Sequence, residues 1–286
     1  MKGNFNKGIK ELNLKNYSFP DNRINFNGGK GMKKKVTIIG GAGTIGTILY
    51  KGLRAKYDIV TLDKNVTEQS AEFVKVDATN FDTLLHSIPK DSDALINLLT
   101  IKTENDLKDV QDFHNMTNIH FVSSFYVLHA AITLGIPKVV YASSNHTTDY
   151  YENNGFSSLG REINTSDFPH SCGLYGVLKF ASENIGQLLA RYSDNLAIIN
   201  LRIGSVHPDE QKAVKEDNRL YRTILSHKDT VQLFDLALQS TVKYGTYYGV
   251  SDNPGKPWST ESAFKELGYV SQENSVEILK RGNPFM

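Results

Sequence analysis

Tyr175 and Lys179 stand four residues apart and are the first side chains whose types and spacing suggest chemistry. On a helix this spacing places both residues on one face. A tyrosine with its ordinary pKa of about 10 is a poor base at neutral pH, and a neighbouring ammonium group favours the phenolate and lowers that pKa. We therefore expect Tyr175 to act as a general base that Lys179 assists. The competing interpretation makes Tyr175 a buried aromatic residue of the core.

A glycine-rich turn at residues 40–46 follows the apolar run 35–39 and precedes a predicted helix. Glycines in this position let the backbone approach a pyrophosphate, and the helix N-terminus stabilises its charge. Asp63 follows the next apolar run and would accept hydrogen bonds from the ribose of a dinucleotide. A 2′-phosphate would meet Asp63 as a like charge, so NAD is favoured over NADP, although Lys64 weakens this argument. A turn that serves only close helix–strand packing is the alternative.

The predicted NAD contacts surround this turn and the ends of the following strands. They are Gly40, Gly43, Thr44, Ile45, Gly46, Asp63, Asp77, Leu98, Tyr175 and Lys179. Asp77 follows the third predicted strand, where it would contact the adenine or simply form a turn.

Short apolar runs alternate with helical patterns and predict the framework that holds these residues. The predicted strands are 35–39, 58–62, 72–76, 93–98, 138–142 and 196–201. Long helical regions are expected at about 105–134 and at 173–192. This order predicts an α/β protein with a Rossmann-type doubly wound parallel sheet. We expect an NAD-binding domain at 32–203. After residue 203 the pattern is less regular, so 204–286 is expected to form a small C-terminal substrate lobe that is not an independent domain.

Residues 1–31 differ from the rest of the chain. They contain seven asparagines and five lysines and show no helix or strand periodicity. We expect a disordered arm, which is common at termini. A mis-assigned start is the alternative, because Gly28-Gly29-Lys30-Gly31 back-translates to a sequence like a ribosome-binding site directly before Met32.

The composition of the 286-residue chain excludes several classes of protein. With 32 Lys+Arg against 31 Asp+Glu, no general attraction to nucleic acid or to an anionic membrane is expected. The longest uncharged stretch, 113–137, contains three histidines and two asparagines and is too polar for a membrane span. The single cysteine, Cys172, can form neither an intramolecular disulfide nor a cysteine-based zinc site. We therefore expect no metal and a cytoplasmic location.

Three features in this order resemble the extended branch of the short-chain dehydrogenase/reductase superfamily, the NAD-dependent epimerase/dehydratase type. They are the Gly-x-x-Gly-x-x-Gly spacing at 40–46, Ser144 after the fifth predicted strand, and Tyr175-x-x-x-Lys179. The resemblance implies that Ser144 is the third catalytic residue and orients the reacting oxygen towards Tyr175. A helix or turn cap is the alternative role of Ser144.

Further stretches are similar to uronate dehydrogenases and related NAD-dependent sugar dehydrogenases, over about residues 35–270. They are Ser-Ser-Asn-His-Thr at 143–147, Gly-Leu-Tyr-Gly-Val at 173–177, Arg-Ile-Gly-Ser at 202–205 and Ser-His-Lys-Asp at 226–229. The similarity implies a sugar site that consists of Ser144, Asn145, His146, Ser205 and Arg219. Arg219 would bind a carboxylate, because a guanidinium pairs with it bidentately. Arg222, one turn further, is the alternative, and His146 could instead be a surface residue.

The chain departs from this subgroup at several positions. It has Ile101-Lys102 where the subgroup has a serine after the fourth strand, and His120 where relatives often have an asparagine. The loop before Arg219 carries the additional residues Lys212 and Lys215. These lysines would bind a substrate phosphate, or they are solvated surface charges.

The resemblance implies NAD-dependent oxidation of the anomeric carbon of an acidic monosaccharide to a lactone. Alternatives are a sugar-phosphate dehydrogenase and a nucleotide-sugar epimerase or dehydratase with tightly held NAD. The C-terminal segment is short for holding a nucleotide-linked sugar, which argues against the epimerase or dehydratase. A non-catalytic NAD-sensing protein is a further alternative, and the presence of Ser144, Tyr175 and Lys179 together argues against it. A homodimer through the two long helices is expected.

Overall fold

The structure, a computed structural model, describes residues 33–102 and 107–281. The prediction for residues 1–31 lies outside the described residues, as does the start of the helix expected from about residue 105.

Seven parallel strands form one sheet in the order β3-β2-β1-β4-β5-β8-β9. The strands are β1 (Lys35–Ile39), β2 (Asp58–Asp63), β3 (Phe73–Lys75), β4 (Ala94–Asn97), β5 (Lys138–Ser144), β8 (Ala197–Ile203) and β9 (Tyr244–Gly249). The strand order reverses between β1 and β4, which is where a doubly wound sheet opens a crevice for a ligand. The predicted fold class is therefore confirmed.

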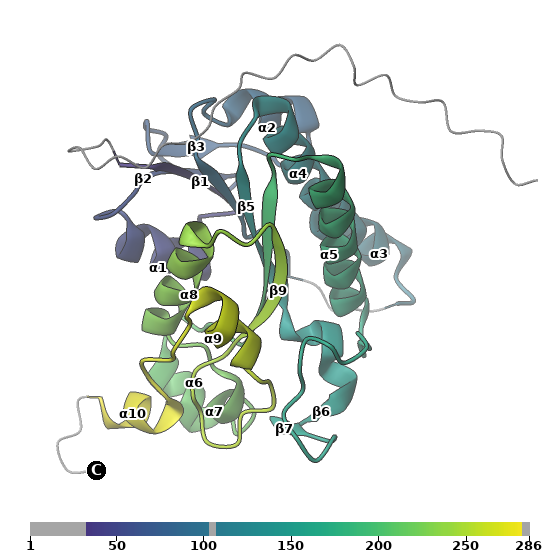
Figure 1. Cartoon of the computed structure of the whole chain (residues 1–286), viewed down its shortest axis with the longest axis vertical. Helices are drawn as coiled ribbons and strands as arrows, with labels where there is room; N and C mark the ends of the chain where they lie inside the picture. The colour runs from purple at the N-terminus through teal and green to yellow at the C-terminus, as the bar shows by residue number, and fades with distance from the viewer. Residues whose placement is uncertain (1–32, 103–106, 282–286) are drawn as a thin grey trace, which may run out of the picture. The chain divides into compact units, whose positions relative to one another are not determined.

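Helices cover both faces of this sheet (Figure 1). One group consists of α1 (Thr44–Leu53), α8 (His227–Gln239) and α9 (Glu261–Leu267). The other consists of α2 (Phe81–Ser87), α4 (Ser123–Leu134) and α5 (Leu174–Tyr192). Each group buries its own apolar cluster against the strands, because parallel strands present apolar side chains on both faces.

Shorter elements surround the carboxyl ends of the strands. They are α3 (Val110–Thr117), a π-helix (Asn118–Val122), a 3₁₀ segment (Asn145–Tyr151), the hairpin β6 (Glu152–Asn153) and β7 (Phe156–Ser157), α6 (Glu210–Glu216), α7 (Leu220–Thr223) and α10 (Ser275–Lys280). The π-helix joins α3 to α4 without a break, so the long helical region predicted up to residue 134 is present in its described part.

The segment after residue 203 contributes more to the sheet than the sequence predicts. β9 pairs in parallel with β8 over six residues, and α8 packs against α1. The division at residue 203 therefore separates two hydrogen-bonded strands. β9 has the sequence Tyr-Gly-Thr-Tyr-Tyr-Gly, whose two glycines weaken the apolar pattern expected of a parallel strand.

Candidate active site

The glycine turn after β1 has the geometry of an anion-binding site. Gly40 has φ +80°, and a Cβ on Gly46 would lie 2.2 Å from the carbonyl oxygen of Gly41, so both positions require glycine. A Cβ on Gly43, directly before α1, would come only to an ordinary contact distance of 3.9 Å from the carbonyl oxygen of Gly40. Thr44 begins a helix that has no side-chain cap and no acidic residue in its first turn. The N–H groups of this helix end fit the pyrophosphate of a dinucleotide.

Asp63 connects the glycine turn to the end of β2. Its carboxylate accepts hydrogen bonds from the Ala42 N–H at 3.0 Å and from the Asn65 N–H at 2.8 Å. Asp63 thus lies beside the turn, as its predicted contact with the ribose requires.

The remaining predicted NAD contacts lie along the same edge of the sheet. Asp77 accepts bonds from the N–H and hydroxyl of Thr79, which lower the pKa of its carboxyl group, so Asp77 forms a turn here. Leu98 lies next to the turn, because a Cβ on Gly40 would come within 3.0 Å of its carbonyl carbon. Thr44 and Ile45 form the start of α1. These contacts remain predictions.

The first turns of α5 carry Tyr175 and Lys179. A Cβ on Gly176 would lie 2.0 Å from the carbonyl oxygen of His146, so this glycine lets α5 approach the 3₁₀ segment. The Lys179 Nζ donates to the carbonyl of Ala142 at 2.8 Å and lies 5.7 Å from the centre of the Tyr175 ring. The predicted shared helix face is therefore present.

Burial shifts both groups away from their ordinary pKa values. It lowers the pKa of Lys179 to about 7, and Glu183, one turn further along α5, acts in the opposite direction. Burial raises the pKa of Tyr175. Its hydrogen bonds with Ser144 and Thr100 act in the opposite direction and offset part of this increase. In the chain by itself the pKa of Tyr175 is thus raised, because loss of solvent around the phenol outweighs the partners that favour its charged form.

Ser144 ends β5, and Asn145 and His146 follow it; Ser144 and His146 lie beside Tyr175, and Asn145 bonds to Ser144. The hydroxyl of Ser144 accepts the N–H of His146 at 3.2 Å, and the His146 ring centre lies 5.7 Å from that of Tyr175. His146 Nδ1 bonds to Asp149 at 2.8 Å. Asn145 is buried, and its side-chain nitrogen has no hydrogen-bond partner among the described residues. The structure therefore brings these three residues together with the predicted base.

Sequence reasoning missed a buried ion pair between α5 and β8. Glu183 on α5 accepts Arg202 Nε at 3.0 Å and Nη2 at 2.7 Å, and Ser143 donates its hydroxyl to the same carboxylate. Both charged side chains are 3% exposed. Arg202 continues to the hydroxyl of Tyr248 on β9 at 3.4 Å. The spacing of Glu183 four residues after Lys179 was the available signal.

His120 lies in the π-helix, with its ring 4.9 Å from the ring of Tyr175 and nearly perpendicular to it. It is fully buried, and its ring nitrogens have no hydrogen-bond partner within the described ranges. Burial lowers the pKa of His120 to about 3, so it is neutral at physiological pH. The wider helical turn places this residue against the base, which suits the frequent occurrence of π-helices at functional sites.

Ser205 follows the end of β8, and Arg219 directly precedes α7. The N–H of Ser205 donates to the carbonyl of Thr223 at 2.9 Å, which ties the end of β8 to α7. Arg219 precedes α7 and donates to the Glu152 carboxylate from Nε at 3.0 Å and Nη2 at 2.8 Å. Arg222, the alternative carboxylate ligand, lies over the ring of Phe156 at 3.8 Å.

The three additional lysines are exposed. Lys102 follows β4, and Lys212 and Lys215 lie on α6. The structure thus does not bury any of them at the predicted site.

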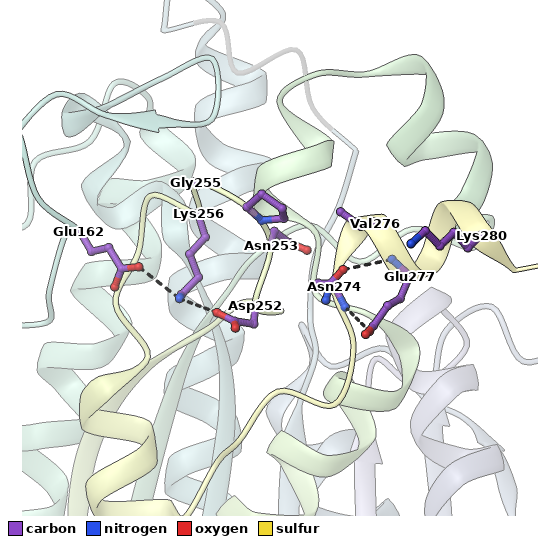
Figure 2. A pocket seen from close by; sticks show the side chains of 10 residues that line it. Glu162, Asp252, Asn253, Gly255, Lys256, Asn274, Val276, Glu277 and Lys280 are labelled. Carbon is purple, nitrogen blue, oxygen red and sulfur yellow. Dashed lines mark hydrogen bonds and ion pairs between the residues drawn. The ribbon is translucent and has the colours of Figure 1, made fainter. Parts of the chain in front are cut away.

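A cavity of about 570 Å³ lies in the C-terminal segment and does not include any predicted site residue (Figure 2). Lys256 crosses it and pairs with Glu162 at 3.2 Å and with Asp252 at 2.9 Å. The charge of Lys256 is therefore already paired within the chain.

Two kinds of feature are absent from the residues that the structure describes. His, Cys, Asp and Glu side chains form no group of three there that could hold a metal ion. None of the helices in these ranges combines the length and the apolar content that a bilayer crossing requires.

The model of the NAD dependent epimerase/dehydratase family matches residues 36–246. The chain belongs to this family. The match confirms the predicted family, the NAD cofactor and the prediction of an enzyme. The glycine turn at the uncapped N-terminus of α1 fits that cofactor.

Several known proteins are similar to this member of the family. Uncharacterized protein YtbQ of Bacillus subtilis is 50% identical over 247 residues, 86% of this chain and 97% of that protein. NAD-dependent glucose-6-phosphate dehydrogenase of Haloferax volcanii is 27% identical over 271 residues, 89% and 99% of the two chains. The crystal structure of glucuronic acid dehydrogenase from Chromohalobacter salexigens has a TM-score of 0.71 at 25% identity and covers 89% and 91%.

Proposed function

We propose that this protein oxidises the anomeric carbon of a free monosaccharide to a lactone, with NAD as the hydride acceptor. The observation that carries the proposal is the grouping of Ser144, Tyr175 and Lys179 at the carboxyl end of β5, where Lys179 Nζ also donates at 3.3 Å to the carbonyl of Leu99, beside Gly40 of the glycine turn. Similarity to enzymes named for glucose 6-phosphate and glucuronic acid supports a sugar substrate.

Tyr175 removes the proton from the C1 hydroxyl, and Ser144 orients that oxygen by a hydrogen bond. Because burial raises the pKa of Tyr175, the base needs nearby positive charge, and Lys179 provides part of it when protonated. NAD supplies the hydride acceptor and the positive charge of its oxidised ring when it is bound. Gly43, Thr44 and Asp63 would hold it at the N-terminus of α1.

The polar groups around Tyr175 suit the hydroxyls of a sugar. Asn145 offers a buried amide nitrogen without a described partner, and His146 and Ser205 add further hydrogen-bonding groups. The resemblance to uronate dehydrogenases implies an acidic monosaccharide whose carboxylate reaches Arg219. Because Arg219 is already paired with Glu152, the proposal is stated for a free monosaccharide without a required carboxylate.

A panel of neutral aldoses, uronates and sugar phosphates, followed by NADH absorbance at 340 nm, tests this proposal. We expect lactone formation with at least one free monosaccharide. Turnover of sugar phosphates alone, weakened by replacing Lys212 and Lys215 with alanine, would favour a sugar-phosphate dehydrogenase instead. NAD retained through purification, without net NADH formation, would indicate an epimerase or dehydratase.

The proposed homodimer uses the outer faces of α4 and α5. Phe125 on α4 and Val177, Leu188 and Tyr192 on α5 are apolar or aromatic side chains that remain exposed in the single chain. Two such helix pairs would bury these side chains around a two-fold axis. Sedimentation equilibrium of the wild type and of Leu188→Glu tests this arrangement, and a wild-type monomer would contradict it.

A further inference from the structure

Glu152 is bound to the guanidinium group of Arg219, the group that is expected from the sequence to bind a substrate carboxylate. Arg219 donates its Nε and Nη2 hydrogens to Oε2 of Glu152, at 3.0 and 2.8 Å. These two donors form one edge of the guanidinium, the edge that binds a carboxylate bidentately. Glu152 is 5% exposed and Arg219 is 27% exposed, so the internal carboxylate is the more deeply placed partner.

The hairpin β6–β7 fixes Glu152 in this position. The hairpin turn contains Asn154 and Gly155, both with positive φ, and the Gly155 N–H donates to Oε1 of Glu152. A Cβ on Gly155 would come within 3.2 Å of the Arg219 carbonyl oxygen, so the hairpin packs directly on the segment that carries Arg219. The two oxygens of Glu152 therefore have separate partners, one in the hairpin and one at Arg219.

This pair also lies at the ends of segments that carry the predicted sugar ligands. Glu152 directly follows the 3₁₀ segment with Asn145 and His146, and Arg219 precedes α7, which is tied to Ser205. Of the other charged side chains in this region, Asp149 bonds to His146, and Arg222 lies over the Phe156 ring and donates to the carbonyl oxygen of Asn218. A carboxylate that approaches Arg219 therefore meets a guanidinium whose charge is already balanced.

We propose that Glu152 is a specificity-determining residue that takes the place of a substrate carboxylate on Arg219, so that a neutral aldose is preferred over the uronate of the same configuration. The inference rests on the proposed function and narrows its substrate class. A uronate must either displace Glu152, which leaves that buried carboxylate without Arg219, or share Arg219 with it, which places two carboxylates at one guanidinium. The hydroxymethyl group of a neutral aldose meets no such repulsion.

The test compares galactose with galacturonate and glucose with glucuronate, which differ only at C6. We expect the wild type to have the higher kcat/KM with the neutral sugar. Glu152→Gln keeps the shape and an oxygen for Gly155 but removes the negative charge. Two charges this close repel strongly even in a partly polar medium, so Glu152→Gln should raise the uronate-to-aldose ratio of kcat/KM at least about tenfold.

Two controls link the change to Arg219. Glu162→Gln removes a carboxylate that pairs with Lys256 at the cavity of Figure 2, and not with Arg219, and should leave the ratio unchanged. In the double variant Glu152→Gln with Arg219→Gln, the gained preference for uronates should disappear. If the preference for uronates persists in this double variant but disappears when Arg222→Gln is combined with Glu152→Gln, the substrate carboxylate binds Arg222. That result would overturn the proposal.

Binding provides a readout that does not need turnover. Calorimetric titration of galacturonate into the protein with NADH should show at least about tenfold tighter binding for Glu152→Gln than for the wild type. An unchanged ratio and unchanged binding in a folded Glu152→Gln variant would refute the role of Glu152. If no sugar is oxidised by any variant, the proposed function fails instead, while the binding comparison still decides the role of Glu152.

Discussion

Replacing Arg202 by methionine should destabilise the protein strongly, because it leaves Glu183 charged and buried. Arg202 donates to both carboxylate oxygens of Glu183, and each side chain is only 3% exposed. Ser143 remains as a partner but cannot balance the charge. Removing one member of such a buried pair costs about 3–5 kcal/mol. For a chain of this size that corresponds to a loss of roughly 10 °C in Tm.

Thermal unfolding of Arg202→Met followed by circular dichroism measures this loss, and the double variant Glu183→Leu with Arg202→Met is its control. Removing both charges leaves no unpaired ion, so the double variant should lie within about 1–2 kcal/mol of the wild type. A single variant that loses less than about 1 kcal/mol, or a double variant as unstable as the single one, would refute the reasoning.

Three further predictions address the active site. Tyr175→Phe should reduce turnover at least about a hundredfold while NADH binding, followed by fluorescence, stays within about threefold; substantial remaining turnover would exclude Tyr175 as the base. Asp63→Ala should weaken NAD binding at least about tenfold and narrow the preference for NAD over NADP. An unchanged ratio of the KM values for NADP and NAD would show that Asp63 does not contact the ribose. Because the pKa of His120 is about 3 in the folded chain and ordinarily 6.5, the unfolded chain binds one more proton between these values. Stability should therefore fall as the pH drops from 6.5 to 3, and His120→Asn should reduce that slope by about 1.4 kcal/mol per pH unit, measured by denaturant unfolding.

The sequence predicts the parts of the site that local patterns determine. The glycine turn at 40–46 lies between an apolar strand and a helix, and Tyr175 and Lys179 share one helix turn, so their positions follow from neighbouring residues. The six predicted strands are present within one or two residues at each end. Periodicity and glycine placement are sufficient there.

Contacts between distant segments could not be predicted in the same way. Glu152 and Arg219 are 67 residues apart, and only the folded hairpin and α7 bring them together. The pKa of Tyr175 depends on how much solvent its neighbours exclude, and the Tyr-x-x-x-Lys spacing gives no information on those neighbours. β9 was missed because its glycines and tyrosines fit a strand only once β8 provides the neighbouring backbone.

The late position of β9 also has a consequence for the growing polypeptide. β8 pairs with β5 on one side, but its other partner is synthesised only after α6, α7 and α8. Until then β8 is an edge strand whose side chains are almost all buried in the finished sheet. Exposed apolar edges of this kind pair readily with other molecules. Premature termination between residues 203 and 244 should therefore give aggregates, and chaperone binding during synthesis should be concentrated in that interval.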